Sequence, residues 1–95
     1  MIIVVFKTKL KSEVKVEEYL NLAQRLVEET RKEEGCLMYT LHEDLNDPSV
    51  LMTLEEWENQ EALEQHNQSE HVLTIVPELK KMRESQEINI YKEVQ

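Results

Sequence analysis

The chain has 95 residues, enough for one domain and too few for two. Its net charge of −9 argues against nucleic acid and anionic membranes as partners, because both would repel it. A composition of 40% hydrophobic and 33% charged residues is that of a globular protein rather than a disordered one.

The opening apolar run, residues 2–6, is too short for a signal peptide or a membrane span and predicts a buried strand over residues 2–10. Cys36 is the only cysteine, which rules out an intrachain disulfide and fits a reducing cytoplasm. We expect it to be a buried small hydrophobe rather than a reactive thiol.

A long amphipathic helix is predicted next, with Ser12 as its N-cap and Glu13 as its first residue. Apolar residues recur at three- and four-residue spacing as far as Thr30. Gly35 is placed to end this helix as a left-handed cap.

A β-hairpin follows, with strands over residues 36–45 and 50–57 joined by an Asn-Asp-Pro-Ser turn. Both faces of these strands carry apolar side chains. On the first strand, alternation groups Leu37, Tyr39 and Leu41 on one face and Cys36 and Met38 on the other. On the second, it groups Leu51 and Trp57 on one face and Val50, Met52 and Leu54 on the other.

Two shorter helices and a last strand complete the predicted elements. Asn59 can cap a helix carrying Ala62, Leu63 and His66, and Ser69 can cap another that continues to Met82. Pro77 suggests a kink or break in the second of these helices. The last strand is expected over residues 87–94, with apolar residues on both faces.

The resulting order, β-α-β-β-α-β with the second helix split, predicts a ferredoxin-like α+β fold with a four-stranded antiparallel sheet. Residues 1–95 are expected to form one domain. Helices can cover only one face of such a sheet, whereas these strands are apolar on both. We therefore expect a homodimer that packs the open sheet faces together.

The residues that could carry chemistry cluster in and after the third strand. There is no Gly-rich phosphate loop, no CxxC and no HExxH, so nothing supports a nucleotide or a structural zinc site. Glu55 and Trp57 share a strand face, where burial would raise the pKa of the carboxyl. His66 is expected on the apolar side of the short helix, and His71 at the start of the next, where a neutral imidazole is favoured.

Each of these residues also has a purely structural interpretation. Trp57 and Tyr39 could be core fillers, and Glu55 could form an ordinary salt bridge or lie at the rim of the sheet. His66 could bind a backbone carbonyl, and His71 could be solvated. The two histidines are five residues apart, a poor same-face spacing on a helix, so no metal site is expected.

An ordered set of motifs along nearly the whole chain resembles the antibiotic biosynthesis monooxygenase (ABM) family. The set begins with Glu-Glu-Gly-Cys-Leu-Met-Tyr at residues 33–39 and Asp47-Pro48. Glu55-Glu56-Trp57 follows, and then Ala62-Leu63, His66 and His71. The resemblance implies a dimeric α+β barrel and a pocket between sheet and helices, lined by Trp, His and Tyr.

The resemblance also implies a function, because some members oxygenate aromatic or quinol substrates with O₂ and without flavin, metal or haem. In that scheme His66 or His71 is the base or anion stabiliser, Trp57 and Tyr39 form an aromatic wall, and Glu55 orients a histidine or a substrate hydroxyl. Haem-degrading relatives use a first-strand Asn and a later His that this chain lacks. No cofactor is therefore expected.

Three functions remain open on the sequence. The first is a cofactor-independent monooxygenase acting on a small aromatic or quinone-like molecule. The second is a non-catalytic dimeric module that binds such a molecule. The third is an isomerase or lyase of the same fold, which would use a histidine for proton transfer without O₂.

Overall fold

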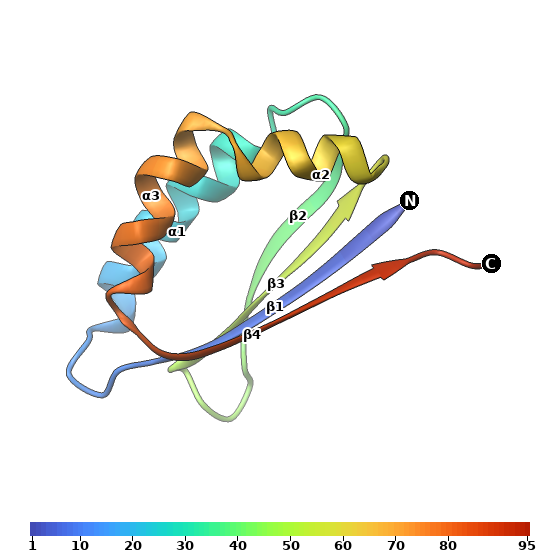
Figure 1. The fold of residues 1–95 in the computed structure, drawn as a ribbon. Helices are drawn as coiled ribbons and strands as arrows, with labels where there is room; N and C mark the ends of the chain where they lie inside the picture. Colours follow the sequence, from blue (N-terminus) through green and yellow to red (C-terminus); the bar gives the residue numbers. More distant parts are fainter.

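The computed structural model describes all residues, 1–95, as a four-stranded sheet with its helices on one face (Figure 1). In chain order the elements are β1 (Ile2–Leu10), α1 (Val16–Thr30), β2 (Cys36–Glu43), β3 (Val50–Trp57), α2 (Gln60–Asn67), α3 (Glu70–Lys80) and β4 (Arg83–Lys92). All neighbouring strands are antiparallel, in the order β2-β3-β1-β4. The ferredoxin-like α+β prediction is confirmed. None of the helices is long and apolar enough to cross a membrane.

The two faces of the sheet differ in what covers them. Val4, Glu55 and Trp57 lie on the face under the helices and are buried. Val5 and its β3 partner Leu54 lie on the open face and are half-buried, although no helix covers them. The predicted second apolar face is therefore present.

The core between sheet and helices consists of two hydrophobic clusters. One lies between the sheet and helices α1 and α3, with Leu10, Tyr19, Ala23, Leu26, Leu51, Ile75 and Leu79. The other lies near α2, with Val4, Val27, Tyr39, Trp57, Ala62 and Leu63. The candidate site forms where these two clusters meet.

Two expectations about α1 were wrong. The helix begins at Val16, not at Glu13, and Lys15 rather than Ser12 occupies the N-cap. A turn closed by the Val14 N–H on the Lys11 carbonyl precedes it, and this turn lets Val14 pack against the core. At its other end the helix stops at Thr30, before it can reach Gly35.

Gly35 is nevertheless the one residue with a left-handed backbone, at φ +88°. It leads into β2 and lies directly beneath α2. A Cβ at this position would approach the Cβ of Ala62 to 2.6 Å. Glycine is therefore required here both by backbone conformation and by the close approach of α2.

The strand boundaries also differ from prediction. β2 ends at Glu43, and β4 begins at Arg83 rather than residue 87 and ends before Val94. A register irregularity between Cys36 and Met38 reverses the expected alternation there. As a result Cys36 packs against the core and Leu37 is exposed, the opposite of the predicted grouping.

The predicted break at Pro77 does not occur, because α3 continues through it to Lys80. Pro77 lies on the exposed side of the helix. The actual interruption comes earlier, at Gln68 and Ser69 between α2 and α3. Asn59 and Ser69 cap the two helices as predicted, by accepting hydrogen bonds from the backbone N–H groups of Ala62 and Val72.

Candidate functional site

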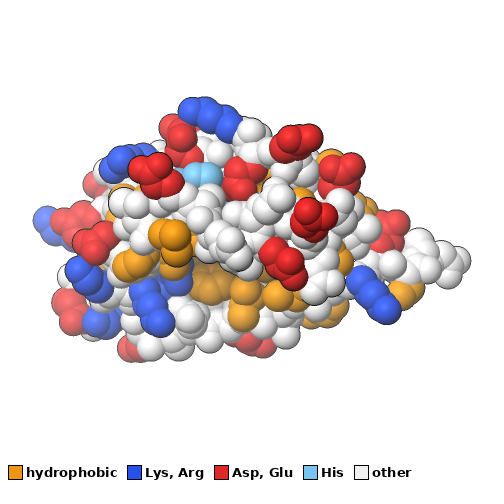
Figure 2. Space-filling model, turned by 45° about the horizontal axis from the view of Figure 1, so that its top comes forward, with side chains coloured by type: hydrophobic (Ala, Val, Ile, Leu, Met, Phe, Trp, Pro, Cys, Tyr) orange, Lys and Arg blue, Asp and Glu red, His pale blue; other side chains and the backbone are white.

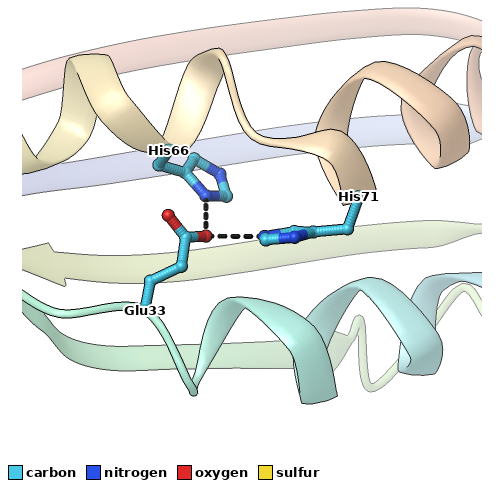
Figure 3. Close-up of side chains that lie close together, drawn as sticks. All are labelled: Glu33, His66 and His71. Atoms are coloured by element: carbon cyan, nitrogen blue, oxygen red, sulfur yellow. Dashed lines mark hydrogen bonds and ion pairs between the residues drawn. The ribbon is translucent and has the colours of Figure 1, made fainter.

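Two histidines from different helices converge on one carboxylate oxygen (Figure 3). His66 Nδ1 and His71 Nε2 each lie 2.7 Å from Oε2 of Glu33, which comes from the loop after α1. The break between α2 and α3 makes this possible, because the N–H and hydroxyl of Ser69 both donate to the His66 carbonyl and end α2 there. The chain then turns before α3 begins, so the five-residue separation no longer keeps the two rings apart.

His66 is the buried member of this cluster, with 5% of its surface exposed. Its ring centroid lies 4.6 Å from that of Trp57 and 5.8 Å from that of Tyr39. Burial lowers the pKa of His66, and the hydrogen bond to Glu33 opposes that shift in part. A neutral imidazole that donates from Nδ1 to a carboxylate holds its lone pair on Nε2, the atom that a general base uses.

Glu55 is a buried carboxyl with no cation beside it. It accepts hydrogen bonds from Trp57 Nε1, 3.0 Å from Oε1, and from the Thr53 hydroxyl, 3.5 Å from Oε2. Burial raises the pKa of Glu55 to about 7, although both hydrogen bonds work in the other direction. The alternative of an ordinary salt bridge for Glu55 is therefore wrong.

A mainly apolar cavity of about 170 Å³ lies between the helices and the sheet. The sheet contributes Phe6, Tyr39, Glu55 and Arg83 to its lining, and α2 contributes His66. Figure 2 shows hydrophobic side chains gathered in a hollow, with basic side chains to its left and acidic ones above it and to its right. Since cavities of about 150 Å³ hold benzene, a small aromatic ring fits this space.

Arg83 is the single cation that lines this cavity. Its guanidinium lies 4.5 Å from the centre of the Phe6 ring, and its Nε donates to the hydroxyl of Tyr19 at 3.1 Å. These contacts hold the guanidinium against the cavity wall. The guanidinium could donate hydrogen bonds to an anionic or carbonyl oxygen of a bound molecule.

Glu33, His66 and His71 are also residue types that hold divalent metals, with donor atoms within 4.8 Å of one another. Ligands of one zinc ion, at about 2.0–2.2 Å from it, lie about 3.4 Å apart in tetrahedral geometry. The two contacts of 2.7 Å are shorter than that. They have the length of charge-assisted hydrogen bonds, and we interpret them as hydrogen bonds rather than as a metal-binding arrangement.

The structure brings most of the predicted site residues together, with two differences. Trp57 is fully buried beneath His66 and Glu55, so it supports these side chains and does not form a wall of the cavity. His71 faces a separate surface hollow; Glu33 links it to His66, and the two ring centroids lie 6.1 Å apart.

The sequence interpretation missed Glu33 and Arg83 as members of the site. Glu33 is one of many acidic residues near the end of α1, and only its contact across 33 positions with His66 distinguishes it. Arg83 lies outside the matched motifs, in a segment that was not assigned to a strand. Because Lys80 and Lys81 stand just before it, composition alone does not single out Arg83.

Comparisons with known proteins identify the family of this chain. The family model described as antibiotic biosynthesis monooxygenase (ABM) matches residues 1–78. YcnE of Bacillus subtilis, named as a proposed monooxygenase, is 35% identical over 82 residues, covering 86% of this chain and 85% of that protein. The chain therefore belongs to the ABM family.

Solved structures share the same fold. A conserved protein from Methanosarcina mazei Go1 is 44% identical, with a TM-score of 0.91 and coverage of 97% of this chain and 91% of that one. SnoaB from Streptomyces nogalater, a cofactor-independent oxygenase, has a TM-score of 0.88 over 99% of this chain and 93% of that one. Its 13% identity makes it similar in fold alone.

Proposed function

We propose that this protein is a cofactor-independent monooxygenase that oxidises a small aromatic or quinol substrate with O₂. The observation that carries the proposal is the position of His66. Its ring lines an apolar cavity of aromatic size, while its Nδ1 is held by Glu33. Membership of a family of monooxygenases, and a fold shared with a cofactor-independent oxygenase, support it.

In the proposed first step, the phenolic proton of the substrate moves to Nε2 of His66. Glu33 fixes the tautomer that leaves this atom free and stabilises the imidazolium that forms, as the carboxylate of a catalytic triad does. The second donor to Glu33, His71, holds the carboxylate in place. Glu33 and His71 are thus positioning residues, and His66 is the base.

The deprotonated substrate is electron-rich and reacts with O₂ at a ring carbon, so the substrate itself supplies the electrons. Arg83 faces the same cavity and is proposed to bind an oxygen of the substrate anion. The apolar lining, together with Tyr39, excludes water from the reactive anion. For 1,4-naphthoquinol the balanced reaction with one O₂ gives hydroxynaphthoquinone and one water.

Purified protein incubated with 1,4-naphthoquinol, O₂ and a metal chelator tests this function. We expect hydroxynaphthoquinone to form faster than in the absence of protein, and His66→Ala to slow it by about 10²-fold or more. Gln65→Ala, which changes the exposed neighbour of His66 on the same helix, is the matched control and keeps the wild-type rate. Product formation no faster than autoxidation, or quinone binding without turnover, contradicts the proposal.

We further propose that the active form is a homodimer joined through the open sheet faces. Val5 and Leu54 lie on that face and leave it apolar, and no helix covers them. A monomer would leave this surface in water. Size-exclusion chromatography with light scattering should give twice the chain mass of 11.3 kDa, and a single 11.3 kDa species at micromolar concentration would refute the dimer.

Residues 1–95 are proposed to act as one domain, since the cavity takes side chains from β1 through β4. A cytoplasmic location also stays a proposal, which rests on the single free thiol of Cys36.

A further inference from the structure

We propose that Glu55 is the general acid of the proposed oxygenation, protonating the peroxide oxygen that leaves as water. This inference rests on the proposed function and adds a second catalytic group to it. Glu55 and His66 line the same cavity from opposite layers, the sheet and the helices. A monooxygenase without a cofactor needs both groups, because one proton must leave the ring carbon while another reaches the departing oxygen.

The surroundings of Glu55 favour a protonated carboxyl aimed at the cavity. Its neighbours across the sheet are Val4 on β1 and Tyr39 on β2, so neither side offers a cation. Trp57 occupies Oε1 through a hydrogen bond of 3.0 Å, whereas the contact of Oε2 with Thr53 is long, at 3.5 Å. Oε2 is thus the weakly held oxygen, and a proton on it can be donated to a ligand in the cavity.

Burial is the main reason why this carboxyl prefers its neutral form, and few charged groups face it. The titratable groups around it are Tyr39 and Cys36 on β2, Glu33 after α1, Tyr19 on α1, His66 on α2 and Arg83 on β4. Glu33 adds a nearby negative charge, which raises the pKa of Glu55 beyond the effect of burial. The environment lowers the pKa of His66 and raises that of Glu55, which is the pattern of a paired base and acid.

The step balances in atoms and electrons. After O₂ has added to the ring carbon and the peroxide has taken the proton held by His66, the hydroperoxide carbon still bears a hydrogen. His66 Nε2 removes that hydrogen as a proton, and the C–H electron pair forms the new carbonyl as the O–O bond breaks. Glu55 gives its proton to the distal oxygen, which leaves as water. The Glu55 carboxylate and the His66 imidazolium then return to their resting forms by proton exchange.

Glu55→Gln tests the assignment, because the amide preserves the shape and the acceptor for Trp57 but cannot deliver a proton. With naphthoquinol and O₂, we expect the variant to take up O₂ while hydroxynaphthoquinone formation falls by about 10²-fold. An organic hydroperoxide, measured after catalase has removed H₂O₂, should accumulate instead. Glu58→Gln, at an exposed carboxyl three residues further on, is the control and keeps the wild-type product ratio.

The wild-type pH profile gives an independent test. Hydroxynaphthoquinone formation should decline as pH rises through about 7, where Glu55 loses its proton, and this decline should be absent from Glu55→Gln. If Glu55→Gln keeps the product yield and the pH profile of the wild-type protein, the assignment is wrong. It is also wrong if the variant loses O₂ uptake together with product formation. Absence of turnover in the wild-type protein would instead refute the proposed function itself.

Discussion

Glu55→Gln should also make the protein more stable at alkaline pH, because the wild-type chain must then bury a charged carboxylate. The pKa of Glu55 rises from 4.5 to about 7 on folding. A raised carboxyl pKa means that the folded state binds the proton more tightly than the unfolded state does. The stability that this proton provides is complete below the unfolded pKa of 4.5 and is lost as pH rises through about 7.

The size of the effect follows from the shift. One pKa unit corresponds to about 1.4 kcal/mol. The free energy of unfolding of the wild-type protein should therefore fall by about 3 kcal/mol relative to that of Glu55→Gln between about pH 4.5 and pH 8.5. Many other carboxylates titrate in this range, so only the difference between the two proteins isolates Glu55. The 6% exposure of Glu55 leaves little solvent to reduce the effect.

Urea unfolding of both proteins, at one fixed protein concentration and at several pH values, measures this difference. A fixed concentration matters because association changes apparent stability. We expect the unfolding free energy of Glu55→Gln, relative to that of the wild-type chain, to increase steadily up to about pH 7 and to stay constant above it. A difference in unfolding free energy that stays constant with pH would show that Glu55 is not a buried, raised carboxyl.

Three further predictions follow from other parts of the structure. Trp57→Phe removes a donor that lowers the pKa of Glu55, so the carboxyl carbon of Glu55 should titrate above about 7 by NMR; an unchanged or lower midpoint contradicts the hydrogen bond. Gly35→Ala should reduce the free energy of unfolding by about 2–3 kcal/mol through its left-handed backbone and the contact with Ala62. Ala62→Gly in the same chain should recover part of that loss in urea unfolding, whereas strictly additive effects would exclude the contact. Val5→Asp should convert the proposed dimer to an 11.3 kDa species with unchanged helical circular dichroism, and a retained dimer would place the interface elsewhere.

The sequence predicted the architecture well because hydrophobic alternation and capping residues are local signals. Asn59 and Ser69 marked helix starts correctly, since their side chains bond to backbone only three residues away. Ser12 gave the same signal wrongly, because burial of Val14 favoured a turn over an earlier helix start. The irregular register at Cys36 was also hidden, because strand pairing rather than composition decides it.

The candidate site was less predictable, because its geometry depends on distant segments. His66 and His71 were identifiable as residue types, but the carboxylate between them comes from 33 positions earlier in the chain. The position of Trp57 beneath the cavity, rather than beside it, likewise depends on how α2 packs on the sheet.

Oxygenation with ¹⁸O₂ tests the central claim, that His66 initiates monooxygenation inside this cavity, most directly. Wild-type protein, naphthoquinol and chelator should give hydroxynaphthoquinone that carries ¹⁸O, with water as the other product. His66→Ala should form it only at the rate seen without protein, while Gln65→Ala matches the wild-type chain. Unlabelled quinone with H₂O₂ as the other product, or undiminished labelling by His66→Ala, would contradict the account.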